Sequence, residues 1–291
     1  MSIFQAFEQH PYFLHLSIGL LGLLVGSFLN VVVYRLPIML QRSWRKECLE
    51  FLEQEETSPA SPEVFNLSQP RSRCPFCNHS ITALENIPVL SYLLLKGKCK
   101  NCKKPISIRY PIVELTTALL SVLITLHFGV SLQTVAALLF TWTLICLTLI
   151  DFDTQLLPDS ITLPLLWFAL LASLFHVFVT PETALIGALL GYLSLWSVFW
   201  LFKLLTGKEG MGYGDFKLLA AIGALLGWKM LPLVIMLSAF VGALVGMTLI
   251  VLKGRDKNIP IPFGPYLSIA AYIALIWGDD INRTYLQFVG L

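Results

Sequence analysis

Charged residues are scarce in this 291-residue chain: Asp, Glu, Lys and Arg together make up 13% of it, against roughly 25% in soluble globular proteins. Hydrophobic residues make up 56%, and the mean hydropathy is +0.74. This shortage of charge excludes an ordinary soluble protein and predicts a polytopic membrane protein. The formal net charge of +2 indicates little about partners, whereas the distribution of the charges is informative.

Long runs without Asp, Glu, Lys or Arg predict where the chain crosses the membrane. The first run has neither a basic segment before it nor a small-residue cleavage site after it, so we expect a retained helix rather than a signal peptide. The run at 218–228 is too short to span at the helical rise, so its helix must recruit earlier residues, Asp215 and Lys217 among them. We expect about eight transmembrane helices, from residues 11–34, 115–150 (two helices with a turn near Gly129), 161–180, 183–202, 218–228, 230–252 and 259–278.

The basic residues are distributed unevenly between the two sides of this predicted bundle. With the amino terminus outside, 18 of the 20 Lys and Arg fall on one side, and 12 of these lie between Arg35 and Arg109. Cytoplasmic loops carry such an excess. The cytoplasmic side therefore receives a polar insert at residues 35–109 and the ends of the helices that carry Asp151 and Asp215.

The insert begins with an amphipathic pattern and ends with four cysteines. Leu40, Trp44, Cys48 and Leu52 recur every four residues, which predicts a surface or membrane-interface helix, and residues 53–70 are expected to be irregular. Cys48 and Cys146 are expected to be small core residues. Two C-x-x-C pairs can direct four thiolates at one structural Zn²⁺; disulfides or a redox pair are the alternatives, although disulfides are rare in the cytoplasm. The four residues are Cys74, Cys77, Cys99 and Cys102.

Two aspartates close apolar runs. Ionisable groups at a membrane edge are costly, and two carboxylates that share a proton can activate water, so Asp151 and Asp215 are candidate catalytic residues. Asp153 is expected to be a solvated loop residue, and Asp159 the N-cap of the next helix. The glycines before Asp215, Gly210, Gly212 and Gly214, permit close approach of an extended substrate. The sequence lacks a G-x-x-x-x-G-K-[ST] motif, so a phosphate-binding loop is not expected.

Several motifs together resemble the type IV prepilin peptidases, which combine a leader peptidase with an N-methyltransferase. They are G-S-F-L-N-V-V-V-Y-R-L-P (26–37), R-S-R-C-P-F-C (71–77), N-I-P-V-L-S-Y-L-L-L-K-G-K-C (86–99), R-Y-P-I-V-E (109–114), residues 151–159 and G-M-G-Y-G-D-F-K (210–217). The resemblance covers most of the chain, in the family's order.

This resemblance implies a G-x-G-D intramembrane aspartyl protease of the bacterial inner membrane, with its active face in the cytoplasm. The family's catalytic aspartates map onto Asp151 and Asp215, with Asp159, Gly212, Gly214 and Lys217 in support. Its substrates are prepilins and pseudopilins, whose new amino terminus is methylated with S-adenosylmethionine. Methyl transfer is assigned to the insert, where Gly97 and Lys98 are candidates. No nucleic acid is expected as a partner.

The predicted organisation is a first transmembrane helix (1–34), a cytoplasmic insert with the zinc site (35–109) and a seven-helix membrane peptidase domain (110–291). A proton-coupled transporter with a regulatory zinc insert is the competing function. Carboxylates at the membrane edge, without an obvious inverted repeat, argue against it. A non-catalytic assembly scaffold would explain the insert but not the paired aspartates.

Overall fold

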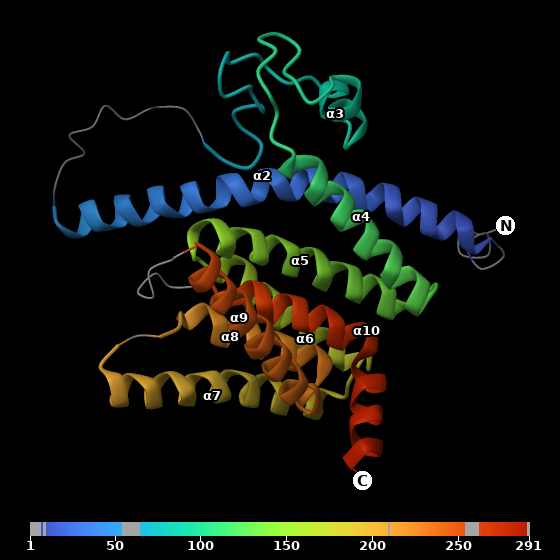
Figure 1. Cartoon of the computed structure of the whole chain (residues 1–291), viewed down its shortest axis with the longest axis vertical. Helices are drawn as coiled ribbons and strands as arrows, with labels where there is room; N and C mark the ends of the chain where they lie inside the picture. Colours follow the sequence, from blue (N-terminus) through green and yellow to red (C-terminus); the bar gives the residue numbers. More distant parts are fainter. Residues whose placement is uncertain (1–6, 8–9, 54–64, 209, 254–261, 290–291) are drawn as a thin grey trace. The chain divides into compact units, whose positions relative to one another are not determined.

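The structure is a computed structural model that describes residues 7, 10–53, 65–208, 210–253 and 262–289. Over these residues it is helical and contains no strand, which confirms the all-α expectation (Figure 1). The chain forms two compact units, Met1–Val130 and Ser131–Leu291. Each unit is built around helices that approach one another closely.

The amino-terminal unit is built on α2 (Pro11–Phe51) and α4 (Arg109–Phe128), which pack together. Two glycines of α2 make this contact possible. A Cβ at Gly22 would lie 2.7 Å from the Cα of Ala118, and a Cβ at Gly26 would lie 2.7 Å from the Cα of Glu114. Small residues spaced four apart allow helix backbones in a membrane to approach in this way.

The helix α2 is longer than the sequence indicated. The segment around Trp44 is helical, as expected, but it continues the first helix without a break, so no separate surface helix forms. From Val31 to Phe51 the chain contains no Gly, Asn or Asp, and Pro37 is accommodated inside the helix. Cys48 is exposed rather than part of a core, whereas Cys146 is buried as expected. Residues 54–64 of the expected irregular stretch lie outside the described residues, and 65–70 are irregular.

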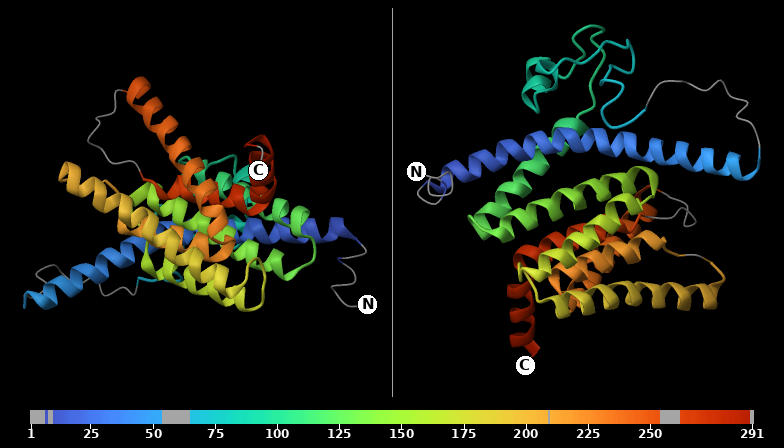
Figure 2. Two further views of the ribbon diagram at one scale, coloured as in Figure 1. Left: turned by 90° about the horizontal axis from the view of Figure 1, so that it is seen from below. Right: turned by 180° about the vertical axis from the view of Figure 1, so that it is seen from behind.

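The carboxy-terminal unit is a helical bundle that encloses a short helix. The helix α8 packs against α6, α7 and α10, while α10 also packs along α5 and α9 (Figure 1, Figure 2). Nearly all of α8 is buried. Its helices are α5 (Leu132–Thr154), α6 (Asp159–Leu174), α7 (Pro181–Thr206), α8 (Tyr213–Leu226), α9 (Leu231–Lys253) and α10 (Gly264–Val289).

Glycines again permit the closest contact, between α7 and α8. Gly187 and Gly223 meet backbone to backbone, and a Cβ at Gly191 would lie 2.5 Å from the carbonyl oxygen of Leu219. The helix α8 recruits Tyr213–Lys217 at its start, as its short apolar run required. Protein, rather than lipid, therefore surrounds most of its length.

The count of eight spans is not confirmed. Each predicted run contains a helix within the described residues, although 259–261 of the last run lie outside them, and only five of the described helices are long and apolar enough to cross a membrane. The helices α6 and α8 have 16 and 14 residues, and α10 begins at Gly264 and carries Asp279, Asp280 and Arg283 in its second half. The five candidates are in α2, α4, α5, α7 and the segment Trp228–Thr248.

Candidate active site and metal centre

Asp151 lies in the last turn of α5 and is held by a backbone group from α10. Its side chain is 5% exposed, and the Gly264 N–H donates to its Oδ2 at 3.0 Å. The helix α5 ends just beyond it because Gln155 adopts a left-handed conformation, with its N–H donating to the Asp151 carbonyl at 2.8 Å. The carboxylate is therefore placed at a helix end and fixed by the start of another helix.

Asp215 lies in the first turn of α8, which begins after the N-cap residue Gly212. Its side chain is 6% exposed, and its Oδ1 has no hydrogen-bond partner among the residues that the structure describes. Leu157 packs against the residue before Asp215 and against Gly264, which bonds Asp151, so the structure brings together the two aspartates that the sequence singled out. Two neighbouring buried carboxylates favour sharing one proton, because ionising both is costly.

Leu157 packs against two backbone positions beside this pair, Gly214 and Gly264. A Cβ at Gly214 would lie 2.6 Å from the Leu157 Cβ, and a Cβ at Gly264 would lie 3.2 Å from its Cδ2. The glycine before Asp215 is thus needed for close packing. Gly212 is less crowded, since a Cβ there would approach Asp215 Oδ2 only to 3.7 Å.

Lys217 and Asp159 form an ion pair that links α8 to α6. The Lys217 Nζ lies 2.7 Å from Oδ1 and Oδ2 of Asp159. Asp159 is the first residue of α6, where Pro158 occupies the N-cap, so its predicted capping role is wrong. Pro158 has an extended backbone with φ −62° and ψ 130°, of which its ring fixes the φ, and the side chain of Asp159 is left available to Lys217. Asp153 is exposed, although it lies in the last turn of α5 rather than in a loop.

Four cysteine sulfurs in the amino-terminal unit gather at one point. All four lie within 4.8 Å of one another, with Sγ–Sγ distances of 3.8 Å for Cys74–Cys102 and 3.9 Å for Cys77–Cys99. A tetrahedral Zn²⁺ with Zn–S bonds of about 2.3 Å would separate its sulfurs by about 3.8 Å. The sulfurs are unpaired thiols here, so the spacing fits a metal better than two disulfides.

The two cysteine pairs have the same backbone geometry. The Cys74 N–H donates to the His79 carbonyl and the Cys99 N–H to the Lys104 carbonyl, both at 2.9 Å. The residue after each second cysteine, Asn78 or Lys103, has a positive φ. Each pair is thus a tight knuckle with both sulfurs directed inward. The backbone N–H of His79 also lowers the pKa of the Cys77 thiol, which favours the thiolate.

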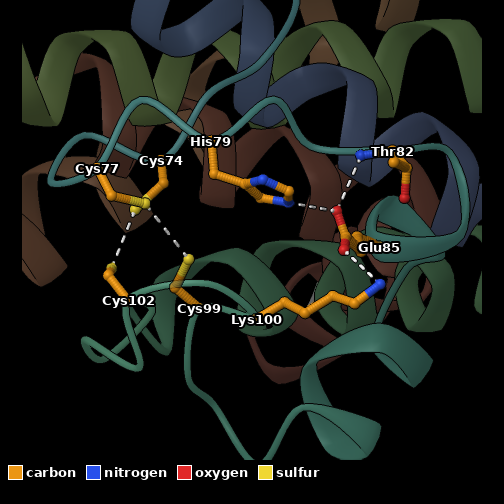
Figure 3. A network of polar contacts seen from close by, with 8 residues as sticks. All are labelled: Cys74, Cys77, His79, Thr82, Glu85, Cys99, Lys100 and Cys102. Carbon is orange, nitrogen blue, oxygen red and sulfur yellow. Dashed lines mark hydrogen bonds and ion pairs between the residues drawn. The ribbon is translucent and has the colours of Figure 1, made fainter.

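Glu85 joins the two knuckles (Figure 3). Its Oε2 accepts from the Thr82 N–H at 3.0 Å and lies 3.2 Å from His79 Nε2, while its Oε1 lies 3.2 Å from Lys100 Nζ. His79 follows the first knuckle and Lys100 lies inside the second. The Thr82 N–H, with Lys100 and His79, lowers the pKa of Glu85 to about 2. The ionised Glu85 carboxylate thus contacts a residue next to the first knuckle and a residue inside the second, and it links the two knuckles.

Gly97, one of the two methyl-transfer candidates, lies against Tyr92. It has a φ of +67°, and a Cβ there would lie 2.9 Å from the Tyr92 Oη and 3.0 Å from its Cζ. Tyr92 belongs to α3 (Leu90–Leu94), whose start is held by the Val89 N–H donating to Glu114 Oε2 at 2.7 Å. Lys98, the other candidate, is exposed and starts the second knuckle.

Sequence reasoning missed three of these residues: Gly264, Tyr92 and Glu114. Gly264 stands between two prolines in P-F-G-P at the start of a helix, a pattern that marks a constrained backbone. Glu114 is an acid six residues into an apolar helix and 7% exposed, which is a functional signal in a membrane segment. Tyr92 carried no signal that sets it apart from a packed aromatic residue.

The fold and these two centres define a class: a multi-pass helical membrane protein with a buried aspartate pair and a four-cysteine metal site. Residues 20–128 match the bacterial peptidase A24 N-terminal domain, and residues 138–247 match the type IV leader peptidase family. The chain belongs to this family of type IV leader peptidases, as relatives along its full length also show.

These relatives are proteins named prepilin leader peptidase/N-methyltransferase. The protein from Pseudomonas aeruginosa is 56% identical over 290 residues, covering 100% of this chain and 99% of the relative. The one from Stutzerimonas stutzeri is 58% identical over 93% of each chain, and the one from Legionella pneumophila is 46% identical over 96% of this chain and 97% of its own. No solved structure matches the chain.

Proposed function

We propose that this chain removes the leader peptide from prepilins and pseudopilins and then methylates the new amino terminus. The relatives carry both activities in their names and align along the whole chain. The observation that carries the peptidase assignment is the burial of Asp151 and Asp215 together, from separate helices, each about 5% exposed. Neither the competing transporter nor the scaffold reading accounts for both named activities.

The aspartate pair supplies the chemistry of peptide hydrolysis without a covalent intermediate. One carboxylate takes a proton from water as it attacks the scissile carbonyl, and the other donates a proton to the carbonyl oxygen. As the C–N bond breaks, the first carboxylate gives its proton to the leaving amine. A hydroxyl of the tetrahedral intermediate returns a proton to the second carboxylate. Since Asp151 and Asp215 lie at helix ends rather than mid-helix, the substrate's scissile bond would enter near the membrane interface.

The distribution of Lys and Arg along the sequence supports a cytoplasmic location for this reaction. Basic residues gather on the side of the chain that carries both aspartates, which favours a cytoplasmic active face in the inner membrane. A prepilin would present its basic leader there, while its apolar segment stays in the bilayer. Lipid and the pilin precursors are the partners that this proposal implies.

We assign methyl transfer to the insert, residues 35–109, and peptide cleavage to residues 110–291. S-adenosylmethionine would supply an electrophilic methyl group to the amine. Gly97 and Lys98, next to the second knuckle, are the candidate residues for this step. The four cysteines, held by Glu85 and the backbone, would bind Zn²⁺ as a structural ion, because four protein ligands leave no position for substrate.

One assay tests both activities. Purified protein is incubated with a pilin precursor and S-adenosylmethionine, and mass spectrometry follows the loss of the leader and the addition of a methyl group. We expect Asp151→Asn and Asp215→Asn to lose leader removal by at least about a thousandfold while methylating a pilin supplied already cleaved. Asp153→Asn, at an exposed position of the same helix, is the matched control. Normal cleavage by either active-site variant would refute the proposed peptidase.

A further inference from the structure

The two aspartates differ in how their oxygens are satisfied. Asp151 Oδ2 accepts a backbone N–H from Gly264, from the first residue of α10, at 3.0 Å. Asp215 Oδ1 is buried and, within the part of the chain that the structure describes, lacks any hydrogen-bond partner. Burying a polar oxygen without a hydrogen-bond partner destabilises the fold. The unequal arrangement calls for a functional reason.

Glycine is required at position 264 because there is no room for a side chain, not because of its backbone conformation. A Cβ at this position would lie 2.6 Å from Asp151 Oδ2 and 3.3 Å from its Cγ. Its φ lies outside the left-handed region that favours glycine, so an alanine could adopt the same backbone. What alanine could not do is leave the Asp151 carboxylate in place. The glycine is needed because a catalytic carboxylate occupies the position of its side chain.

We infer that Gly264 is a positioning residue of the peptidase: its N–H and its missing side chain fix Asp151 and leave Asp215 as the carboxylate with a free oxygen. This inference rests on the proposed function. The N–H bond to Oδ2 favours the ionised form of Asp151, whereas Asp215 Oδ1, for which the described residues offer no donor, is the oxygen better able to hold the proton of the pair. Protonation of Asp215 Oδ1 removes the cost of its unpaired charge and supplies the proton that the scissile carbonyl receives. Asp151 is then the base that activates water.

The kinetic test compares two glycines of α10. Gly264→Ala places its Cβ against Asp151, whereas the close contact of Gly278→Ala is with the flexible side chain of Met230, at 2.9 Å from its Sδ. We expect Gly264→Ala to lower kcat of leader removal at least about 100-fold with KM changed less than about twofold, because it misplaces a reacting group without removing substrate contacts. Gly278→Ala stays within about threefold of the unaltered protein in both constants. A Gly264→Ala enzyme with kcat in that same range would overturn the inference.

A second measurement does not depend on how the Gly264 variant folds. Only two Phe-Gly pairs occur in the sequence, Phe128-Gly129 and Phe263-Gly264. Protein labelled with ¹³C-carbonyl phenylalanine and ¹⁵N-glycine therefore gives two selected amide resonances, and Gly129, bonded to the Thr125 carbonyl at 3.0 Å, is an internal control.

We expect Asp151→Ala to shift the Gly264 amide proton upfield by the loss of its acceptor, with Gly129 unchanged and with a smaller shift in Asp215→Ala. An unshifted Gly264 resonance in Asp151→Ala would overturn the inference even if both aspartates prove essential. Conversely, the expected shifts together with normal cleavage by Asp151→Asn would leave the hydrogen bond standing and refute the proposed peptidase. The two failures are thus distinguishable.

Discussion

Glu85 in the amino-terminal unit and Asp215 in the carboxy-terminal unit are both largely shielded carboxylates, yet they are treated in opposite ways. Glu85 Oε2 accepts the Thr82 N–H and lies 3.2 Å from His79 Nε2, and its Oε1 has no hydrogen bond among the described residues but forms an ion pair with Lys100 Nζ at 3.2 Å. Asp215 keeps one oxygen for which the described part of the chain offers no donor. A carboxylate that holds a fold together is satisfied, whereas one that reacts is left incomplete and costs stability.

The largest test of this contrast is Asp215→Asn. Beyond the loss of cleavage, we expect an unfolding temperature equal to or above that of the unaltered protein, because an amide cannot ionise and so never places a second charge beside the buried Asp151. Thermal unfolding of both proteins in the same detergent measures this. A clear decrease in unfolding temperature would mean that Asp215 is a structural group like Glu85, and the contrast would fail.

Metal removal tests whether the four-cysteine centre and the aspartate pair function independently of each other. Chelation or Cys99→Ser should lower methyl transfer at least about tenfold, because the free energy of metal binding stabilises the folded form of the two cysteine knuckles. Leader removal should fall by a smaller factor, because Asp151 and Asp215 belong to the other compact unit. Returning Zn²⁺ to the chelated protein, but not to Cys99→Ser, should restore methyl transfer. Equal losses of both activities would show that the centres depend on each other.

The sequence predicted the elements of both centres better than their connections. Periodicity and charge located Asp151, Asp215 and the four cysteines, because costly charges and C-x-x-C pairs stand out locally. It could not locate the Gly264 N–H, since this bond joins residues 113 apart and its donor is a backbone group that every residue has. The long α2 was missed for the opposite reason: local helix propensity continued past a polarity change that suggested a boundary.

A smaller effect on methyl transfer is expected from substitutions of Gly97. They test whether glycine is needed there because it has no side chain or because of its backbone conformation. Asparagine tolerates the φ of +67°, but any side chain meets the Tyr92 ring. We expect Gly97→Asn and Gly97→Ala each to lower methyl transfer about fivefold or more, with leader removal unchanged. In a Tyr92→Ala background, Gly97→Asn should cause little further loss, because the clash has gone and asparagine tolerates the backbone conformation. If Gly97→Asn alone retains methyl transfer, conformation rather than space is the requirement.

The smallest effect is expected from Glu85→Gln, and its sign depends on pH. The pKa of Glu85 is lowered from 4.5 to about 2 by the Thr82 N–H, Lys100 and His79, so ionised Glu85 stabilises the fold above about pH 4.5. This contribution is lost as the pH falls toward 2. The unfolding temperature of Glu85→Gln should therefore lie below that of the unaltered protein at pH 6, with the gap narrowing as both are measured at lower pH. Glu47→Gln, at an exposed site on α2, is the control. A gap that is constant with pH would mean that Glu85 acts through its shape rather than its charge, and it would no longer be the paired counterpart of Asp215.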